Sequence, residues 1–192
     1  MTRIEAMIKR SRLVIFFTIA CLSSAHSADN YACEREMLKI ADATQVPVGV
    51  LYAVALTETG QKGELHAYAM NIAGHAVFNA DLSEALGVFN TARREGVNLI
   101  DIGCMQINHF YHGKAFASVA DMFDPHRNVE YAALFLERLR QAEGSWTAAV
   151  ARYHAGPGNP PAQKSYVCAV IRNMVTSGFG GWTNESRAFC EG

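Results

Sequence analysis

The segment that most constrains the fold is 48–58, a helix candidate with apolar side chains on nearly every face. Its body reads VGVLYAVALT, and Pro47 stands at its start, where a missing N–H is tolerated. A helix that is apolar all round must be surrounded by other elements of the fold. Glu58 ends it and is followed by Thr59 and Gly60. The pattern therefore predicts a buried helix that carries a carboxyl group to the edge of a core.

Helical periodicity recurs on both sides of this segment, with start and stop signals at several ends. Asp or Ser stands at the expected N-caps, and Gly follows the expected C-termini. Residues 66–79 break the period, and Ala73-Gly74 predicts a short hairpin turn. Residues 97–107 favour extended structure with a turn at Gly103. The further helices are expected at 29–43, 82–92, 125–143, 146–155 and 163–175. These elements predict a mostly helical α+β fold.

The first 27 residues have the three parts of a secretory signal peptide: a basic start, the apolar run 13–22 and small residues at its exit. Cleavage after Ser27 fits best, cleavage after Ala25 is close behind, and lipidation of Cys21 is a third option. The apolar run is too short for a retained span. We expect an exported, periplasmic protein with no stable membrane span in its mature form.

Beyond this segment the chain holds Cys33, Cys104, Cys168 and Cys190. An even number of cysteines in an exported chain favours structural disulfides. Four cysteines allow three pairings, and their spacing does not choose among them. Cys104 with His154 as its base is also a candidate thiol nucleophile.

Charge and histidine spacing exclude several classes of partner. The whole chain carries a net charge of −1 and its first 27 residues carry +3, so residues 28–192 carry −4. A nucleic-acid partner is not expected, because phosphate binding needs clustered Lys and Arg. His109 and His112 are three residues apart, but no acidic third ligand stands at a metal-site spacing. We expect neither a metal nor a cofactor.

Glu58 is the strongest candidate for chemistry. A carboxyl group at the end of an apolar helix is expected to lose solvation, and lost solvation favours its protonated form. A protonated carboxyl can donate its proton to the leaving oxygen of a glycosidic bond. The alternative is a Glu exposed at a helix end with no chemical role.

Three blocks of sequence carry a resemblance to a known family. They read ALTETG at 55–60, GCMQIN at 103–108 and ARYHAG at 151–156. In this order and rough spacing they resemble lytic transglycosylases of the soluble, goose-lysozyme-like type. The resemblance covers about residues 31–175 and is greatest to small exported members that accompany conjugation and secretion machinery. It implies a lysozyme-like fold over 28–176 with a small β-hairpin region after the catalytic helix.

The resemblance implies a role for each matching residue. Glu58 matches the single catalytic acid, and Thr59 replaces a more usual Ser that helps to position substrate. The remaining substrate-binding candidates are Met105, Gln106, Asn108, Tyr153, His154 and Tyr166. One of them departs from the family, because His154 replaces an Asn. Met105 and Gln106 match the family's glycan-binding turn, although Cys104 before them replaces a usual Leu. The resemblance also implies that Cys33 pairs with Cys104, which leaves Cys168 and Cys190 to tether the Gly-rich tail 177–192.

The implied reaction cleaves the β-1,4 bond between N-acetylmuramic acid and N-acetylglucosamine of peptidoglycan with formation of a 1,6-anhydro product. Two alternatives stay open: a muramidase that uses water on the same bond, and an inactive peptidoglycan-binding component of a secretion apparatus. Asp101 is the nearest second carboxylate, expected to be a structural turn or cap residue, and hydrolysis becomes possible if it faces Glu58. We expect Tyr111 and His112 to line the sugar groove, residues 67–100 to form one of its walls, and two aromatic residues, Phe135 and Trp146, to lie in the core.

Overall fold

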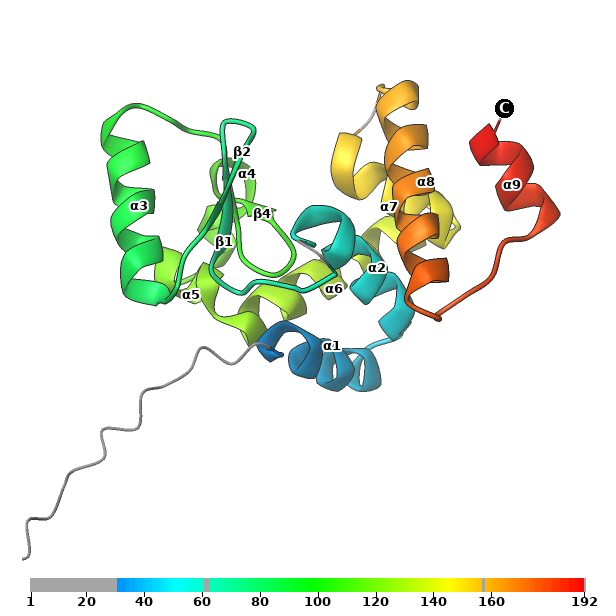
Figure 1. Ribbon diagram of the computed structural model, residues 1–192, viewed down its shortest axis with the longest axis horizontal. Helices are drawn as coiled ribbons and strands as arrows, with labels where there is room; N and C mark the ends of the chain where they lie inside the picture. Colours follow the sequence, from blue (N-terminus) through cyan, green and yellow to red (C-terminus); the bar gives the residue numbers. More distant parts are fainter. Residues whose placement is uncertain (1–30, 61–62, 157, 192) are drawn as a thin grey trace, which may run out of the picture.

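The computed structural model describes residues 31–60, 63–156 and 158–191. The signal peptide expected over 1–27, Cys21 and the expected start of the mature domain at residue 28 lie outside this range. Figure 1 shows a lobe with the β-strands and a lobe of helices, at opposite ends of the long axis. No helix within the described ranges is long and apolar enough to cross a bilayer.

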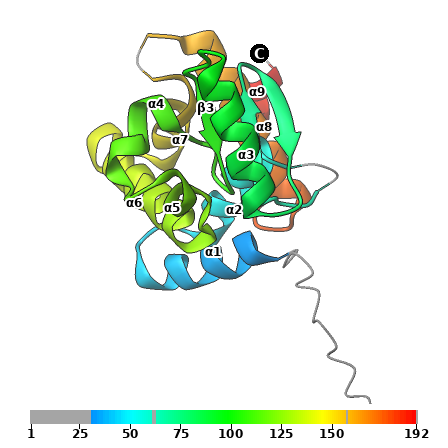
Figure 2. The ribbon, with the colours of Figure 1, turned by 90° about the vertical axis from the view of Figure 1, so that its left-hand side faces the viewer.

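Helix α2 is buried at the centre of the helical lobe, as the sequence predicts. Leu51, Ala53, Val54 and Ala55 are 0% exposed, because α1 and α8 pack against α2. Figures 1 and 2 both place α1 below α2 and α6, and α6 in turn contacts α7. The helices of this lobe are α1 (Ala32–Ala43), α2 (Val48–Glu58), α6 (Pro125–Glu143), α7 (Trp146–Ala155) and α8 (Pro160–Thr176).

Local sequence signals fix where these helices begin and end. The Asp124 carboxylate accepts a hydrogen bond from the Arg127 N–H at the start of α6, and Gly144 ends α6 in the left-handed conformation. Ser145 caps α7 in the same way through the Ala148 N–H. The turn between α6 and α7 is therefore short, and the two helices pack side by side.

The other lobe is built on a four-stranded antiparallel sheet in the order β2-β1-β3-β4. Ala73-Gly74 joins β1 to β2 as predicted, and the sheet gains two more strands from the extended segment around Gly103. Helix α3, capped by Asp81, packs against β1 and α5. The elements are β1 (Ala69–Ile72), β2 (His75–Phe78), α3 (Leu82–Arg94), β3 (Ile100–Ile102), β4 (Ile107–Asn108), α4 (His109–His112), a 3-10 turn (Gly113–Ala115) and α5 (Val119–Phe123). The mostly helical α+β prediction is confirmed.

The turn between β3 and β4 is anchored to the helical lobe. Gly103 has φ +79°, and a Cβ on it would lie 2.6 Å from Nδ2 of Asn128, so the turn requires glycine. Asn128 is 0% exposed; its amide donates to the Ile102 and Met122 carbonyls and accepts from the Met105 N–H. The Cys33–Cys104 disulfide joins the same turn to α1.

The second disulfide, Cys168–Cys190, ties α9 (Asn184–Glu191) to α8. Both disulfides are the pairs that the family resemblance implies, and the first excludes Cys104 as a free thiol nucleophile. A helix within 177–192 is not predicted from the sequence. Its apolar residues are the three consecutive positions 188–190, which do not show a helical period, and none of its residues is buried.

Candidate active site

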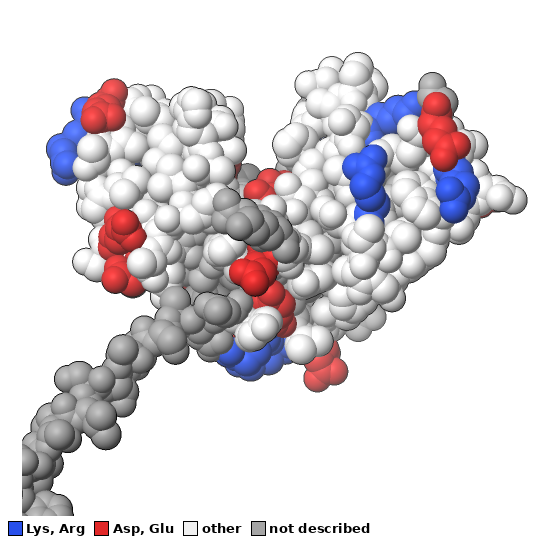
Figure 3. All heavy atoms as spheres, viewed as in Figure 1, with Lys and Arg blue, Asp and Glu red and all other residues white. Residues whose placement is uncertain are grey.

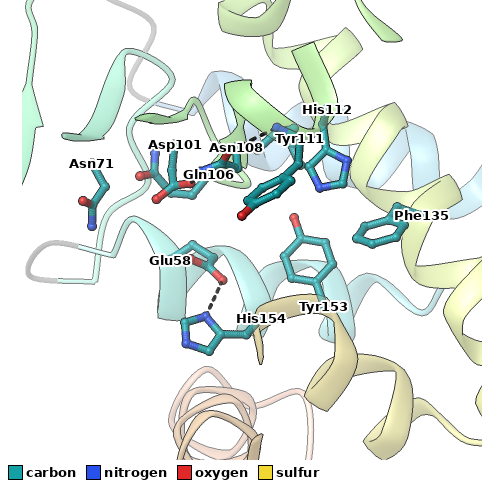
Figure 4. A pocket seen from close by; sticks show the side chains of 11 residues that line it. Glu58, Asn71, Asp101, Gln106, Asn108, Tyr111, His112, Phe135, Tyr153 and His154 are labelled. Atoms are coloured by element: carbon teal, nitrogen blue, oxygen red, sulfur yellow. Dashed lines mark hydrogen bonds and ion pairs between the residues drawn. The ribbon is translucent and has the colours of Figure 1, made fainter. Parts of the chain in front are cut away.

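A cleft of about 280 Å³ opens between the two lobes. Figure 3 shows this face of the molecule hollowed between them, with acidic atoms at the bottom of the hollow. Figure 4 shows two sets of side chains that face each other across the cleft. We call Glu58, Phe135, Tyr153 and His154 the helical wall, and Asn71, Asp101, Gln106, Ile107 and Asn108 the sheet wall. Tyr111 and His112, both from α4, complete the lining.

Glu58 enters the cleft from the C-terminal end of α2. Its side chain is 16% exposed, so protein atoms cover most of its surface. The hydroxyl of Tyr166 donates a hydrogen bond of 2.6 Å to its Oε1. Tyr166 is itself buried, and burial raises the pKa of its hydroxyl well above the ordinary value. The hydroxyl therefore keeps its proton and acts as a donor to this carboxyl group.

His154 approaches the same carboxyl group from α7. Its Nδ1 lies 3.8 Å from Oε1 of Glu58, an ion-pair distance rather than a hydrogen bond. Its ring is stacked on the Tyr166 ring, with centroids 4.2 Å apart and planes 3° from parallel. The Glu58 carboxylate raises the pKa of His154, more than burial lowers it.

The sheet wall holds a second carboxylate among amides. Strand β3 buries Ile100 and Ile102 and leaves Asp101 on the cleft side, because side chains alternate along a strand. Oδ1 of Asp101 accepts a hydrogen bond of 2.7 Å from Nδ2 of Asn108. Burial raises the pKa of Asp101, and the nearby Glu58 adds to this effect. The sequence predicts only a structural role for Asp101, whereas in the structure Asp101 lines the same cleft as Glu58.

Gln106 has a backbone conformation that is rare outside glycine, with φ +47°. Its side-chain amide donates to the carbonyls of Gly103 and Ala69, which folds the side chain over the β3–β4 turn at the cleft. Strained backbone of this kind concentrates at functional sites, since the surrounding structure has to hold it. The turn is therefore a preformed part of the sheet wall.

Aromatic side chains close one end of the cleft. Phe135 packs against His112 and Tyr153, with ring centroids 5.2 and 5.6 Å away. The Tyr153 hydroxyl donates to the Met105 carbonyl at 2.8 Å and so links the two walls, and burial raises its pKa well above the ordinary value. Tyr111 is 68% exposed at the rim. Such surfaces suit the apolar faces of sugar rings.

The cleft thus combines a poorly solvated carboxyl group, neutral hydroxyl donors and aromatic surfaces, which are the groups that acid-assisted glycosidic cleavage needs. Within the described residues, no group of three or more His, Cys, Asp or Glu side chains could hold a metal ion. The family model of the transglycosylase SLT domain matches residues 36–172. The chain belongs to this family. Searches of curated proteins and of solved structures returned no significant match.

Membership of the SLT family supports lytic transglycosylase activity on peptidoglycan as the general function, and the fold is the lysozyme-like α+β fold of that domain. The SLT match contains every residue that lines the cleft and ends before α9. Five of the predicted site residues meet in the cleft: Glu58, Gln106, Asn108, Tyr153 and His154. Tyr111 and His112 line it too, as expected.

Three predicted site residues of the SLT domain do not line the cleft. Thr59 is 5% exposed and its hydroxyl donates to the Ala55 and Cys104 carbonyls. The prediction that Thr59 contacts substrate directly is therefore wrong, and its hydroxyl helps to hold the β3–β4 turn. Met105 is 0% exposed, and its side chain lies in the core. Tyr166 contacts Glu58 rather than the cleft surface.

Three residues of the cleft, Asn71, Ile107 and Phe135, were not identified as site residues from the sequence. Phe135 is expected to be core, but it is only half-buried and lines the cleft. Trp146 is also half-buried rather than fully inside. Asn71 lies on β1 within the segment expected to form a wall, but burial does not alternate along that strand, so the local pattern does not mark Asn71 as a cleft residue.

Proposed function

We propose that this SLT domain cleaves the β-1,4 bond between N-acetylmuramic acid and N-acetylglucosamine of peptidoglycan and forms a 1,6-anhydro product, with Glu58 as acid and then as base. The observation that carries this proposal is the setting of Glu58. It ends the buried helix α2, is 16% exposed, accepts a hydrogen bond from Tyr166 and lines the cleft.

The contacts of Glu58 support a defined proton donor. Both Tyr166 and His154 approach Oε1, so Oε2 is the oxygen available for the transferable proton. Glu58 gives that proton to the glycosidic oxygen, and the bond from this oxygen to C1 of the muramic residue breaks. The neighbouring N-acetyl oxygen stabilises the positive charge that forms at C1.

Glu58 is now a carboxylate and acts as a base. It takes the proton of the C6 hydroxyl of the same sugar, and the C6 oxygen bonds to C1 to close the anhydro ring. This proton replaces the one that Glu58 gave to the leaving sugar in the first step, so the enzyme ends as it began. An internal nucleophile has a high effective molarity, so the step needs no second carboxylate to activate water.

Hydrolysis of the same bond is the second candidate, favoured by one observation. Asp101 lines the cleft with Glu58, and the two carboxyl groups influence each other electrostatically. A carboxylate in this place could stabilise positive charge at C1 or activate water, as paired carboxylates do in glycoside hydrolases. The product decides between the two reactions, because the anhydro product is one water lighter than the hydrolytic one.

Export is a further part of the proposal. The sequence of the first 27 residues supports delivery to the periplasm, where peptidoglycan lies, and two disulfides suit an oxidising compartment. The resemblance to small exported members supports service to a secretion or conjugation apparatus.

Mass spectrometry of fragments released from purified glycan strands tests the proposal. The parent protein is expected to give anhydro-muramic ends, and a Glu58→Gln variant is expected to give no fragments above the buffer blank. Hydrolytic ends alone would establish the muramidase reaction instead. Strands that bind the parent protein but stay intact would identify an inactive binding component.

A further inference from the structure

His154 provides a feature that the proposed reaction does not use. It is a titratable group next to the catalytic carboxyl group, at a position where the family resemblance implies an uncharged Asn. Its Nδ1 lies 3.8 Å from Oε1 of Glu58. Its side chain is 48% exposed, so it can exchange protons with solvent, whereas Glu58 is largely shielded.

Tyr166 orients both members of this pair. Its hydroxyl donates to Oε1 of Glu58 at 2.6 Å, and its ring is the surface on which the imidazole is stacked, 4.2 Å away. A buried residue that contacts both groups holds them in a fixed relation. The approach of His154 to Glu58 is therefore supported by α2, α7 and α8 together.

The charges that face His154 favour its protonated form. Glu58 on α2 is the nearest, and Asp101 on β3 acts in the same direction from the opposite wall. Tyr166 on α8 and Tyr153 on the same helix as His154 both keep their protons, because burial raises their pKa values. Two carboxylates and two neutral hydroxyls thus surround one imidazole.

We propose that Glu58 and His154 share one titratable proton, which lies on one group or the other, and that His154 thereby sets the alkaline limit of the reaction. This inference rests on the proposed role of Glu58 as the acid. The pair with one proton has two forms of equal net charge: carboxylate with imidazolium, and carboxylic acid with neutral imidazole. Only the second form is reactive, since an imidazolium beside Glu58 would oppose the positive charge that forms at C1. It is refilled from the first form as it is consumed. The pair loses its last proton only when the pH exceeds the pKa of His154.

An isolated carboxyl group loses its proton at lower pH than an imidazole. Ordinary pKa values of Glu and His differ by about two units. Replacing His154 by Asn removes the imidazole from the pair, so the alkaline limb of the pH profile is expected to move down by at least about one pH unit. His154 acts here as a positioning residue for a proton, because its effect passes through Glu58.

The experiment measures kcat/KM for glycan strands across the pH range in the parent protein, His154→Asn and His154→Gln. Both variants remove the titration, and the second keeps a side chain of similar length if the first fails to fold. His126→Asn is the matched control, since His126 also pairs with a Glu, 3.0 Å from Glu36, is 49% exposed and lies outside the cleft. Its profile should superimpose on that of the parent.

Nuclear magnetic resonance provides a readout that does not need activity. The imidazole of His154 is titrated in the parent and in Glu58→Gln, and its pKa is expected to fall by about half a unit or more when the carboxylate is removed. An unchanged pKa, or a His154→Asn profile identical to the parent, overturns the shared proton. A different result contradicts the proposed function itself, namely a Glu58→Gln variant that still releases fragments.

Discussion

The helical wall and the sheet wall of the cleft each hold one carboxyl group, and the partners of the two groups differ in kind. Glu58 receives a phenolic hydroxyl and lies beside an imidazole. Asp101 receives the side-chain amide of Asn108. Hydroxyl and imidazole groups can stabilise a carboxyl group both before and after it gives up its proton, whereas an amide mainly fixes the position of the carboxyl group.

The supports behind the two walls differ as well. The helical wall depends on buried helices that pack through apolar side chains, with the Tyr166 hydroxyl as the polar link to Glu58. The sheet wall depends on one buried amide, Asn128, and one disulfide beneath a short turn. The comparison therefore assigns proton transfer to the helical wall and substrate orientation to the sheet wall, and each half of this assignment can be tested.

The largest expected effect compares the two carboxyl groups directly. Glu58→Gln should lower the rate of fragment release from purified sacculi by about 10³-fold, because it removes the proposed general acid. Asp101→Asn should lower it by no more than about tenfold, since the amide keeps the shape and can still accept from Asn108. Circular dichroism checks that both variants are folded. Equal losses in the two variants would contradict the division between the walls.

The second prediction concerns the support of the sheet wall. Asn128→Ala should destabilise the protein by about 3 kcal/mol, because it leaves the Met105 N–H and the Ile102 and Met122 carbonyls without their buried partner. Urea unfolding measures the change. Asn90→Ala on the exposed face of α3 is the control and should stay within about 0.5 kcal/mol of the parent. A loss below about 1 kcal/mol for Asn128→Ala would mean that the turn is held by other contacts.

The third prediction isolates the polar link of the helical wall. Tyr166→Phe keeps the ring that stacks on His154 but removes the donor to Glu58, and it should lower kcat by about tenfold. KM should change little, because Tyr166 does not line the cleft. Tyr68→Phe, which alters a tyrosine packed against Phe123, is the control. A change confined to KM would show that Tyr166 binds substrate after all.

The sequence predicts those features that depend on short stretches of chain. The apolar period of α2 and the Glu-Thr-Gly at its end place Glu58 without reference to the rest of the molecule. The Ala73-Gly74 turn and the Asp124 and Ser145 caps are equally local, and the structure has each of them. Strand alternation around Asp101, with Ile on both sides, also contains the signal for a side chain that faces away from the core.

Other features depend on contacts between distant segments. Thr59 faces inward because the Cys104 carbonyl, 45 residues away, accepts from its hydroxyl. Phe135 has the spacing of a core residue, but its face of α6 meets the cleft, and helical periodicity does not distinguish these two surroundings. Helix α9 is tethered through Cys190 rather than through a buried apolar face. Such positions are set by tertiary packing and were not predicted from local pattern.

The smallest expected effect tests whether Asp101 is kept in the cleft at the expense of stability. Burial raises the pKa of Asp101 in the folded protein above its value in the unfolded chain, so the folded state binds the proton more tightly. Stability should therefore fall as the pH rises from the unfolded pKa through the folded pKa. Asp101→Asn removes this dependence.

Above the folded pKa of Asp101, the Asp101→Asn variant should be more stable than the parent by less than about 1 kcal/mol, since the carboxylate is only partly buried. The difference should vanish below about pH 3, where the Asp101 carboxyl group is protonated in both states. Urea unfolding at several pH values measures it, with Asp42→Asn on the exposed face of α1 as the control. If the parent instead gained stability relative to Asp101→Asn as the pH rises, the Asp101 carboxylate would support the fold. Its presence in the sheet wall would then need no role in orienting substrate.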